Sequence, residues 1–111
     1  MSQAVFQLQR VDTPEGAPSV ARVSGDVDVT NAEDFTESIS ALSSVRPVVV
    51  DLSLLNYLDS AGFDALDRLL AADKVSIVIA PDSPIHRAAV VMELPFQQDT
   101  GSAIRSLAGE G

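Results

Sequence analysis

The segment PVVVDLSLLNYLDSAGFDAL, residues 47–66, combines two patterns. Its first half contains Val48–Leu52, a near-continuous β-branched and aliphatic run that is typical of a strand buried on both faces in a parallel sheet. Its second half repeats apolar residues at helical spacing, which predicts a helix from about Ala61 to Ala72. Asp59 and Ser60 stand at the junction, where a side-chain oxygen accepts a free N–H group of the first helical turn. A helix start also accommodates an added phosphate, because free N–H groups and the positive dipole end face it.

The flanking sequence predicts strands that alternate with helices. Stretches at residues 5–11 and 19–24 are separated by DTPEGAP, whose prolines and glycine break regular structure, so they predict an opening strand pair. A second buried run, Val75–Ala80, predicts an interior strand that neighbours Val48–Leu52. This order of elements favours an α/β fold with a mostly parallel central β-sheet, an N-terminal strand pair and about four helices.

The connection between the second strand and the first helix has its own signals. Gly25 is expected to end the strand, and Thr30 is followed three residues later by Glu33. This spacing predicts a capping box, in which each side chain accepts a hydrogen bond from the backbone N–H of the other residue. Apolar periodicity then predicts a helix over residues 31–43. The loops GDVDVT and NYLDSAG are therefore both expected beyond the carboxyl ends of strands, where functional loops of such folds gather.

Length and composition favour one small domain, spanning residues 1–111. A chain of 111 residues buries about two-thirds of its unfolded surface and needs no metal or disulfide to fold. It contains no cysteine, which excludes disulfides and thiol chemistry. The N-terminus lacks the features of a signal peptide, and no run approaches the roughly 18 apolar residues of a membrane span. We therefore expect a cytoplasmic protein without a membrane span.

The formal net charge is −9. Such a surface repels nucleic acid and anionic membranes, so direct nucleic-acid binding is not expected. A protein partner with a basic face would be attracted. Solubility alone is an equally good reason for the acidity, so the charge by itself does not identify a partner.

The sequence is poor in the groups that enzymes use. The single histidine, His86, lies in a predicted first helical turn, where a solvated surface role is expected. The chain has neither a phosphate-binding loop with its lysine nor the glycine-rich dinucleotide fingerprint. No set of His or Cys residues offers zinc ligands. We therefore expect no cofactor, no catalytic residues and no enzymatic activity.

Three aspartates could have either a functional or a structural role. Asp51, at the end of a buried strand, has the position of a phospho-acceptor aspartate in receiver domains, but the acidic pair that holds magnesium there is missing after the first strand. A role in holding the following backbone N–H groups is favoured instead. Asp26 and Asp28 flank Val27 and together offer two cation ligands, yet two ligands from one loop make a weak site. A solvent-facing acidic loop is the favoured interpretation.

Three stretches of the sequence resemble the STAS domain family, in particular the bacterial anti-sigma factor antagonists. Residues 47–66 are similar to its central motif: a buried strand, Asp-Leu-Ser, a short link, then Asp-Ser-x-Gly and an apolar helix. GDVDVTNAEDF resembles the family's acidic loop and first helix, and IVIAPDSPIHRAAVVMEL resembles its later strand, loop and helix. The order and spacing match over nearly the whole chain.

The resemblance implies a partner-switching function. The unmodified antagonist binds an anti-sigma factor that is a serine kinase of the GHKL type, and this binding releases a sigma factor. The kinase phosphorylates the serine of Asp-Ser-x-Gly and so expels the antagonist, and a phosphoserine phosphatase restores it. Ser60 matches that serine.

The same resemblance implies a set of site residues. Phosphorylation is expected at Ser60, and partner binding at the acidic loop and the helix start: Asp26, Asp28, Thr30, Asp59, Ser60, Ala61 and Gly62. Two positions depart from the family pattern. Ala61 stands where a second hydroxyl residue is frequent, which removes an alternative acceptor, and Asp26 stands where Glu is frequent.

Two other functional classes remain open. One is a STAS scaffold or transport-associated subunit that is never phosphorylated, and the other is a small-ligand-binding module. Retention of Ser60 argues against the first class. The shortage of His, Cys and phosphate-binding loops argues against the second.

Overall fold

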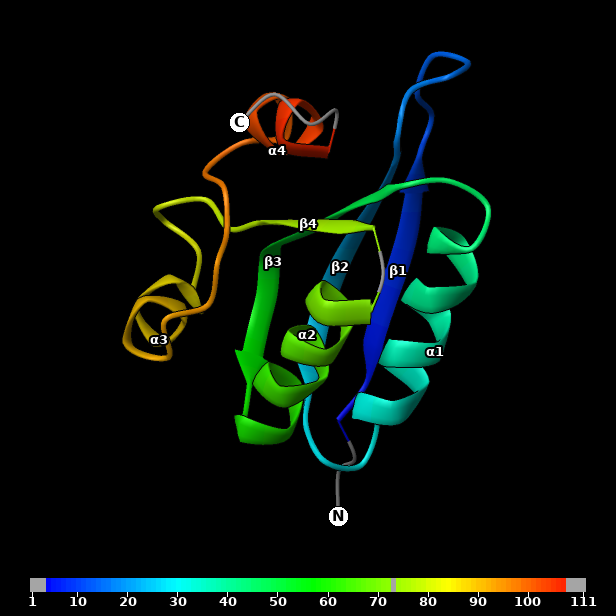
Figure 1. Cartoon of the computed structure of the whole chain (residues 1–111). Coiled ribbons are helices and arrows are strands. Elements are labelled where there is room, and N and C mark those ends of the chain that lie inside the picture. Colours follow the sequence, from blue (N-terminus) through cyan, green and yellow to red (C-terminus); the bar gives the residue numbers. More distant parts are fainter. Residues whose placement is uncertain (1–3, 73, 108–111) are drawn as a thin grey trace.

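A four-stranded sheet lies at the centre of the computed structural model, which describes residues 4–72 and 74–107. Its strands, in spatial order, are β1 (Phe6–Val11), β2 (Ser19–Val27), β3 (Val48–Leu58) and β4 (Val75–Val78). β1 and β2 pair antiparallel, whereas β2–β3 and β3–β4 pair parallel (Figure 1). The predicted α/β fold with an N-terminal strand pair is confirmed.

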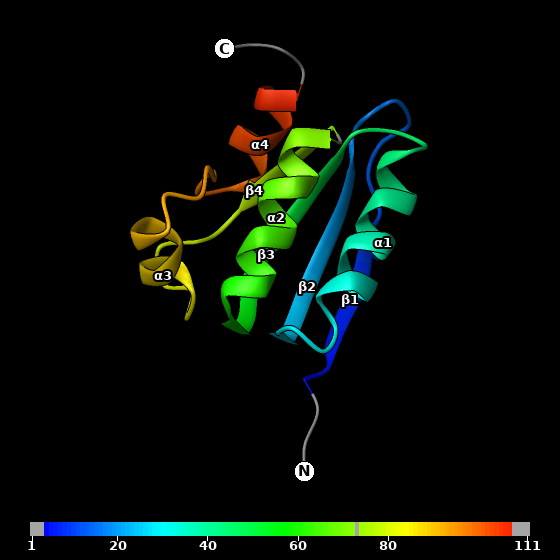
Figure 2. The ribbon, with the colours of Figure 1, turned by 60° about the horizontal axis from the view of Figure 1, so that its bottom comes forward.

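Four helices in the described part of the chain surround this sheet: α1 (Ala32–Ser43), α2 (Ser60–Ala72), α3 (His86–Val91) and α4 (Thr100–Leu107). α1 and α2 lie side by side over one face, as Figure 2 shows. α4 packs on β3 and β4 from the opposite face.

The Asp99 carboxylate caps α4, because the Ser102 N–H donates to its Oδ1 at 2.7 Å. Hydrogen bonds from Ser102 lower the pKa of Asp99 below its usual range.

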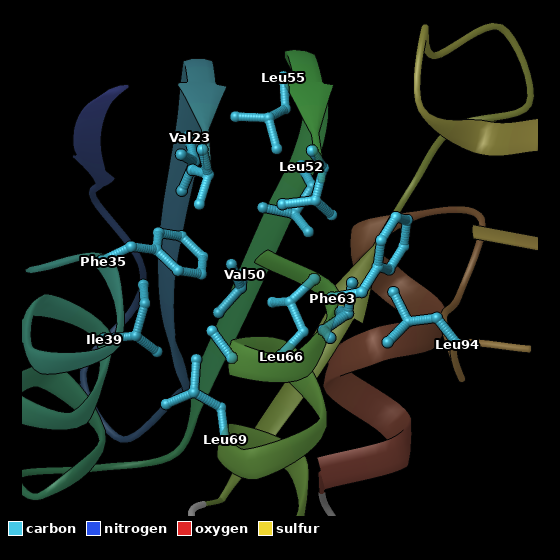
Figure 3. Packing of buried hydrophobic residues seen from close by; sticks show 14 of the residues in the cluster. Val23, Phe35, Ile39, Val50, Leu52, Leu55, Phe63, Leu66, Leu69 and Leu94 are labelled. Atoms are coloured by element: carbon cyan, nitrogen blue, oxygen red, sulfur yellow. The ribbon is translucent and has the colours of Figure 1, made fainter. Parts of the chain in front are cut away.

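The larger core lies between the sheet and the pair α1 and α2 (Figure 3). Phe35 and Ile39 enter it from α1, and Phe63, Leu66 and Leu69 enter it from α2. Each of these five side chains is at most 4% exposed. Burial of one large apolar side chain stabilises a fold by roughly 1.5–3 kcal/mol, so this layer holds both helices on the sheet.

The start of β3 is buried on both faces, as predicted. Val48 and Val50 belong to the larger core, while Val49 belongs to a second, smaller cluster with Ala103 of α4. All three valines are 0% exposed. Two-sided burial explains why this run has no alternating polar residues.

β3 is longer than its apolar run, since it continues to Leu58. Its register with β2 shifts twice, and at each shift β3 contains one residue more than β2. Such bulges bend a strand and change which residues face the core. They bring Leu52, Leu55 and Leu58, spaced by three residues, into the same core cluster. This spacing breaks the strand period of two, so sequence periodicity ended the predicted strand too early.

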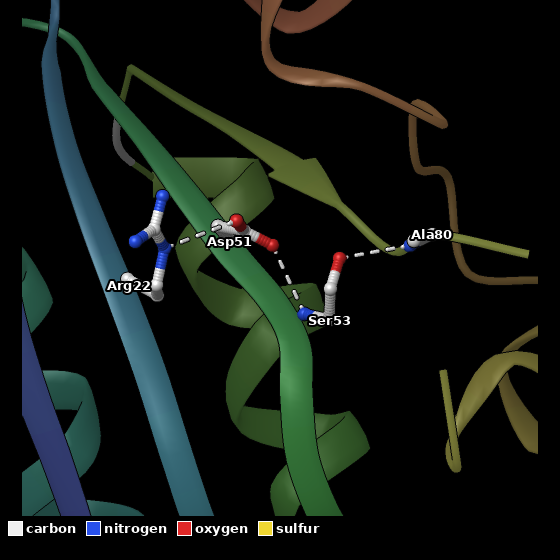
Figure 4. Close-up of polar contacts among 4 residues, drawn as sticks. All are labelled: Arg22, Asp51, Ser53 and Ala80. Carbon is white, nitrogen blue, oxygen red and sulfur yellow. Dashed lines mark hydrogen bonds and ion pairs between the residues drawn. The ribbon is translucent and has the colours of Figure 1, made fainter. Parts of the chain in front are cut away.

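Asp51 organises the first bulge (Figure 4). Its Oδ1 accepts a hydrogen bond from the Ser53 N–H at 3.0 Å, and its Oδ2 lies 3.7 Å from Nε of Arg22 on β2. The Ser53 Oγ in turn accepts the Ala80 N–H, just beyond β4, at 2.9 Å. Asp51 therefore holds a backbone N–H, as expected, but the N–H belongs to the strand itself. The Asp-Leu-Ser motif ties three neighbouring strands together.

Two further expectations about the sheet are wrong. β4 neighbours β3 but is the outermost strand of the sheet rather than an interior one. At its outer edge the Gln97 N–H donates to the carbonyl of Ile77, and the Ile79 N–H donates to the carbonyl of Gln97. Helix packing on both faces, rather than a strand on each side, buries β4. Gly25 lies inside β2 rather than at its end, with φ of 95°. A Cβ at Gly25 would lie 2.3 Å from the carbonyl oxygen of Val5, so this strand position requires glycine.

Candidate functional site

Two connections meet at the carboxyl ends of β2 and β3, at the lower end of the molecule in Figure 1. One leads from β2 into α1, and the other leads from β3 into α2. The Asp59 N–H donates to the carbonyl of Val27 at 3.3 Å, and the Val29 N–H donates to Asp59 Oδ2 at the same distance. The loops GDVDVT and NYLDSAG therefore form one surface, as the positions of the strands predicted.

Asp59 is the N-cap of α2. Its Oδ1 accepts the Gly62 N–H at 3.0 Å, and its carbonyl accepts the Phe63 N–H at 3.0 Å. Bonds from N–H groups to a carboxylate are stronger than neutral ones, and the negative charge also suits the helix N-terminus. One carboxylate thus closes the helix start and also fixes the neighbouring loop.

Ser60 is the first residue of α2 and is exposed. Its hydroxyl makes no hydrogen bond with any described residue, so the capping role considered for it belongs to Asp59 alone. The hydroxyls of Thr30 and Ser53 differ from that of Ser60. Thr30 Oγ1 donates to Asp28 Oδ1, and Ser53 Oγ accepts an N–H. Ser60 therefore presents a free hydroxyl at the N-terminus of a well-capped helix.

Gly62 and Ala61 let the helix start approach the sheet closely. A Cβ at Gly62 would lie 2.2 Å from Cδ1 of Leu58 and 3.4 Å from Cγ1 of Val27, both buried. Ala61 is partly buried against the same core. The glycine of Asp-Ser-x-Gly is thus needed for space, and its neighbour Ala61 offers no hydroxyl.

The acidic loop has a fixed shape. Asp28 Oδ1 accepts hydrogen bonds from both the N–H and the hydroxyl of Thr30. The predicted capping box is wrong, because Thr30 turns its hydroxyl to Asp28 rather than to Glu33, and α1 begins two residues after Thr30. Asp26 is partly buried at the end of β2, opposite Tyr57 of β3. The structure brings Asp28 and Thr30 together and places Asp59 beside this loop.

Asn31 was missed in the sequence, although it organises the loop. It is 9% exposed. Its Oδ1 accepts the Asp28 N–H at 2.9 Å, and its Nδ2 donates to the carbonyls of Ala4 and Asp26, each at 3.0 Å. The neighbouring Thr30–Glu33 spacing concealed it. An asparagine directly before an apolar helix was nevertheless a usable signal, since asparagine favours such positions.

Two exposed apolar side chains border the site. Val29 is 75% exposed within the acidic loop, and Tyr57 is 53% exposed close to the end of β3. Apolar groups combined with a tyrosine ring are typical of the centre of protein interfaces. Neither residue was expected to contribute, because both occur in stretches that were assigned from their polar or periodic neighbours.

The described residues contain no group of three or more His, Cys, Asp or Glu side chains arranged to hold a metal ion. His86 packs edge-to-face on Phe96, with ring centroids 5.3 Å apart, and is only partly exposed. Across residues 4–72 and 74–107, none of the helices has the length and apolar character needed to cross a membrane.

The chain belongs to the STAS domain family, whose model matches residues 9–86. This match contains the end of β1, all of β2, β3 and β4, the acidic loop and the Asp-Ser-Ala-Gly sequence at the start of α2. The resemblance noted in the sequence is therefore confirmed at the level of the family.

Solved structures with the same fold include several anti-sigma factor antagonists. One from Mycobacterium paratuberculosis is 22% identical, with a TM-score of 0.71 over 94% of this chain and 95% of its own. A STAS-domain antagonist from Rhodobacter sphaeroides is 25% identical, with a TM-score of 0.55 over 68% of this chain and 88% of its own. The antagonist SpoIIAA in its unphosphorylated form is 18% identical, with a TM-score of 0.57 over 95% and 97% of the two chains.

Proposed function

We propose that this STAS domain is an anti-sigma factor antagonist whose partner binding is switched off by phosphorylation of Ser60. Its structural neighbours from M. paratuberculosis and R. sphaeroides, and SpoIIAA, are named as such antagonists. The observation that carries the proposal is the exposed Ser60 hydroxyl, free of hydrogen bonds with the described residues, on the first residue of a helix whose cap is supplied by Asp59.

The partner is an anti-sigma factor that is itself a serine kinase of the GHKL type. The oxygen of Ser60 attacks the γ-phosphorus of ATP bound to that kinase, the hydroxyl proton passes to a base of the kinase, and ADP leaves. The kinase supplies all catalytic groups, so the domain itself is a substrate and not an enzyme. A phosphoserine phosphatase hydrolyses the phosphoester and restores binding, and the exchange takes place in the cytoplasm.

The surface explains how one phosphate would switch binding. Phosphorylation adds a charge of about −1.5 to −2 next to Asp59, at a helix start that is hydrogen-bonded to the acidic loop carrying Asp26 and Asp28. The fold survives this change because the helix N-terminus favours negative charge and Asp59 keeps the cap in place. The complex does not survive it, since a packed interface would have to desolvate the dianion. A loss of only 1.4 kcal/mol weakens affinity tenfold.

The same proposal assigns the binding surface. Of the seven residues inferred from the resemblance, it comprises Asp26, Asp28, Thr30, Asp59, Ser60 and Ala61, together with the exposed apolar side chains Val29 and Tyr57. Gly62, the seventh, is buried and acts on this surface by setting the position of the helix start. The carboxylates attract a basic partner face and raise the association rate. The apolar groups supply close packing around Ser60.

Incubation with candidate GHKL-type anti-sigma factors and ATP tests the proposal, with intact mass and peptide mapping as the readout. We expect one phosphate, located on Ser60, and a complex that forms before phosphorylation and dissociates afterwards. Ser60→Ala is the matched variant, which should form the complex and take up no phosphate. Phosphate on Ser60→Ala would overturn the assignment of Ser60, and a stable complex without transfer would favour the scaffold function.

A further inference from the structure

The end of the molecule opposite Ser60 carries a second, differently built surface. It is formed by the β1–β2 connection and the α1–β3 connection, both at the upper end in Figure 1. The eight residue steps from Ser19 to Val27 along β2 correspond to about 26 Å at a strand rise of about 3.3 Å. A ligand bound there and a protein bound at Ser60 would therefore not compete for space.

A polar cavity of about 320 Å³ lies at this end, lined by Arg10, Val11, Asp12, Thr13, Ser19 and Arg46. Cavities that bind small molecules start at about 300 Å³, so the site has the size for a small ligand. Five of the six lining residues have polar side chains. The cavity is therefore suited to a charged or strongly hydrogen-bonding ligand.

The two arginines of this cavity are unusual in such an acidic protein. The chain has only seven Lys and Arg residues against sixteen Asp and Glu, and two of the seven line this one cavity. Within residues 4–72 and 74–107 the ion pairs are Arg22–Asp51 and Arg68–Asp64, so neither Arg10 nor Arg46 has a carboxylate partner there. Asp12 also lines the cavity but pairs with neither, which leaves a local charge of about +1.

Ser19 adds a hydroxyl group to the lining of this cavity. Ser19 is 8% exposed, and its N–H donates a hydrogen bond to the carbonyl of Pro47 at 2.9 Å. Its hydroxyl lines the cavity and has no hydrogen-bond partner among the described residues. No buried side-chain nitrogen or oxygen of the described residues lacks a hydrogen-bond partner, so the Ser19 hydroxyl is accessible from the cavity and can donate to a ligand or to water there.

We propose that this cavity binds the phosphate group of a small phosphomonoester or of inorganic phosphate. Each guanidinium presents a planar fork of donors that matches a phosphate bidentately, and the Ser19 and Thr13 hydroxyls add two further donors. The two guanidinium groups and two hydroxyls supply more donors than the two oxygens of a carboxylate can use. A phosphate group has more acceptor oxygens and is therefore the better ligand. Arg46 also lines a neighbouring cavity of about 550 Å³ with Ala17, Pro18, Val45 and Leu107, which offers room for an apolar group attached to the phosphate.

Titration of the labelled protein with inorganic phosphate and with phenyl phosphate, followed by two-dimensional amide NMR at constant ionic strength, tests this site. We expect saturable shifts at residues 10–13, 19 and 46, and none around Ser60. If the ligand is a phosphomonoester, phenyl phosphate binds more tightly and extends the shifts to Ala17 and Val45. If the ligand is free phosphate, the two affinities are equal.

Variants separate this site from general charge attraction. Arg10→Gln and Arg46→Gln should each weaken phosphate binding about tenfold, and Ser19→Ala should weaken it severalfold with all charges retained. Arg87→Gln removes an exposed arginine of α3 that has no ion pair within the described residues, so it is the matched control and should change nothing. Asp12→Asn should strengthen binding.

The outcome that overturns the proposal is an adventitious ion only. Adventitious binding would appear as amide shifts that do not saturate with phosphate, or as equal amide shifts with chloride. It would also appear as equal effects of Arg87→Gln and Arg46→Gln on phosphate affinity. Circular dichroism verifies that each variant is folded, and Ser19→Ala, which creates no charge change, decides the question if an arginine variant is unstable. Ser60→Asp should leave phosphate affinity unchanged, so this result does not depend on the function proposed for Ser60.

Discussion

Asp59 accepts a hydrogen bond from the backbone N–H of Val29, thirty residues away in the sequence, while its other carboxylate oxygen caps α2. One side chain therefore positions both the helix that carries Ser60 and the acidic loop next to it. These bonds hold the candidate phosphorylation site next to the candidate binding loop. A partner that contacts both segments would therefore respond to a change of charge at either one.

Substitution of Asp59 should destabilise the domain in a graded way. Asp59→Ala removes both acceptors, and we expect a loss of about 1–2 kcal/mol in the free energy of unfolding, as for other N-cap deletions. Asp59→Asn keeps one oxygen for the Gly62 N–H and should lose clearly less. Urea denaturation measures both, with the exposed Asp67→Asn of α2 as the control. Equal losses for Ala and Asn would contradict the capping role.

Three variants of Ser60 should separate charge from shape. Because Asp59 supplies the cap, Ser60→Ala should keep nearly the full stability and bind the anti-sigma partner persistently. Ser60→Asp adds one negative charge and should bind far more weakly, whereas Ser60→Asn, of similar size, should stay close to the unmodified protein. Calorimetry gives the three dissociation constants. Equal affinities of the Asp and Asn variants would remove the electrostatic switch.

The acidic loop should act mainly on the rate of association. The double variant Asp26→Asn with Asp28→Asn retains an oxygen that can accept the Thr30 N–H, so the loop should keep its shape. We expect a slower association with the basic partner and a weaker salt dependence, because two attractive charges are lost. Stopped-flow measurement at several salt concentrations checks this. If neither quantity moves, the loop is solvated surface and not part of the interface.

The two-sided burial of β3 has a direct consequence for Val49. Val49→Asp places an unpaired charge at a side chain that is 0% exposed between the sheet and α4, so we expect a loss of several kcal/mol or an unfolded protein. Leu54→Asp on the same strand is the matched control, because Leu54 is 56% exposed. Thermal unfolding compares the two, and similar melting temperatures would be incompatible with the observed packing.

Close packing at the helix start predicts the effect of Gly62→Ala. The added methyl would meet Leu58 at 2.2 Å, and both neighbours in its way are buried, so we expect a loss of about 1–3 kcal/mol from overpacking. Ala61→Gly at the preceding position adds no such contact. A variant Gly62→Ala with unchanged stability would show that Leu58 moves aside freely and that the glycine has another purpose.

The sequence by itself determined the order of strands and helices and the place of Ser60. Both depend on local rules: Val48–Val50 has a β-branched run that requires burial on two faces, and an Asp-Ser pair before an apolar helix is favoured because its oxygens accept free N–H groups. Such preferences arise from interactions within a few residues. They can therefore be predicted from the sequence alone. The sequence does not show, however, which of Asp59 and Ser60 caps the helix.

Only the tertiary structure decided how far β3 extends and what shapes the loop. Two bulges bring Leu52, Leu55 and Leu58 to one face, which no strand period would indicate, and a bulge forms only against a partner strand. Likewise Gly25 is required because Val5 passes 2.3 Å from where its Cβ would lie, and Asn31 is buried because it bonds the distant Ala4 carbonyl. These contacts join residues far apart in the sequence, so their energies exist only after the chain has folded.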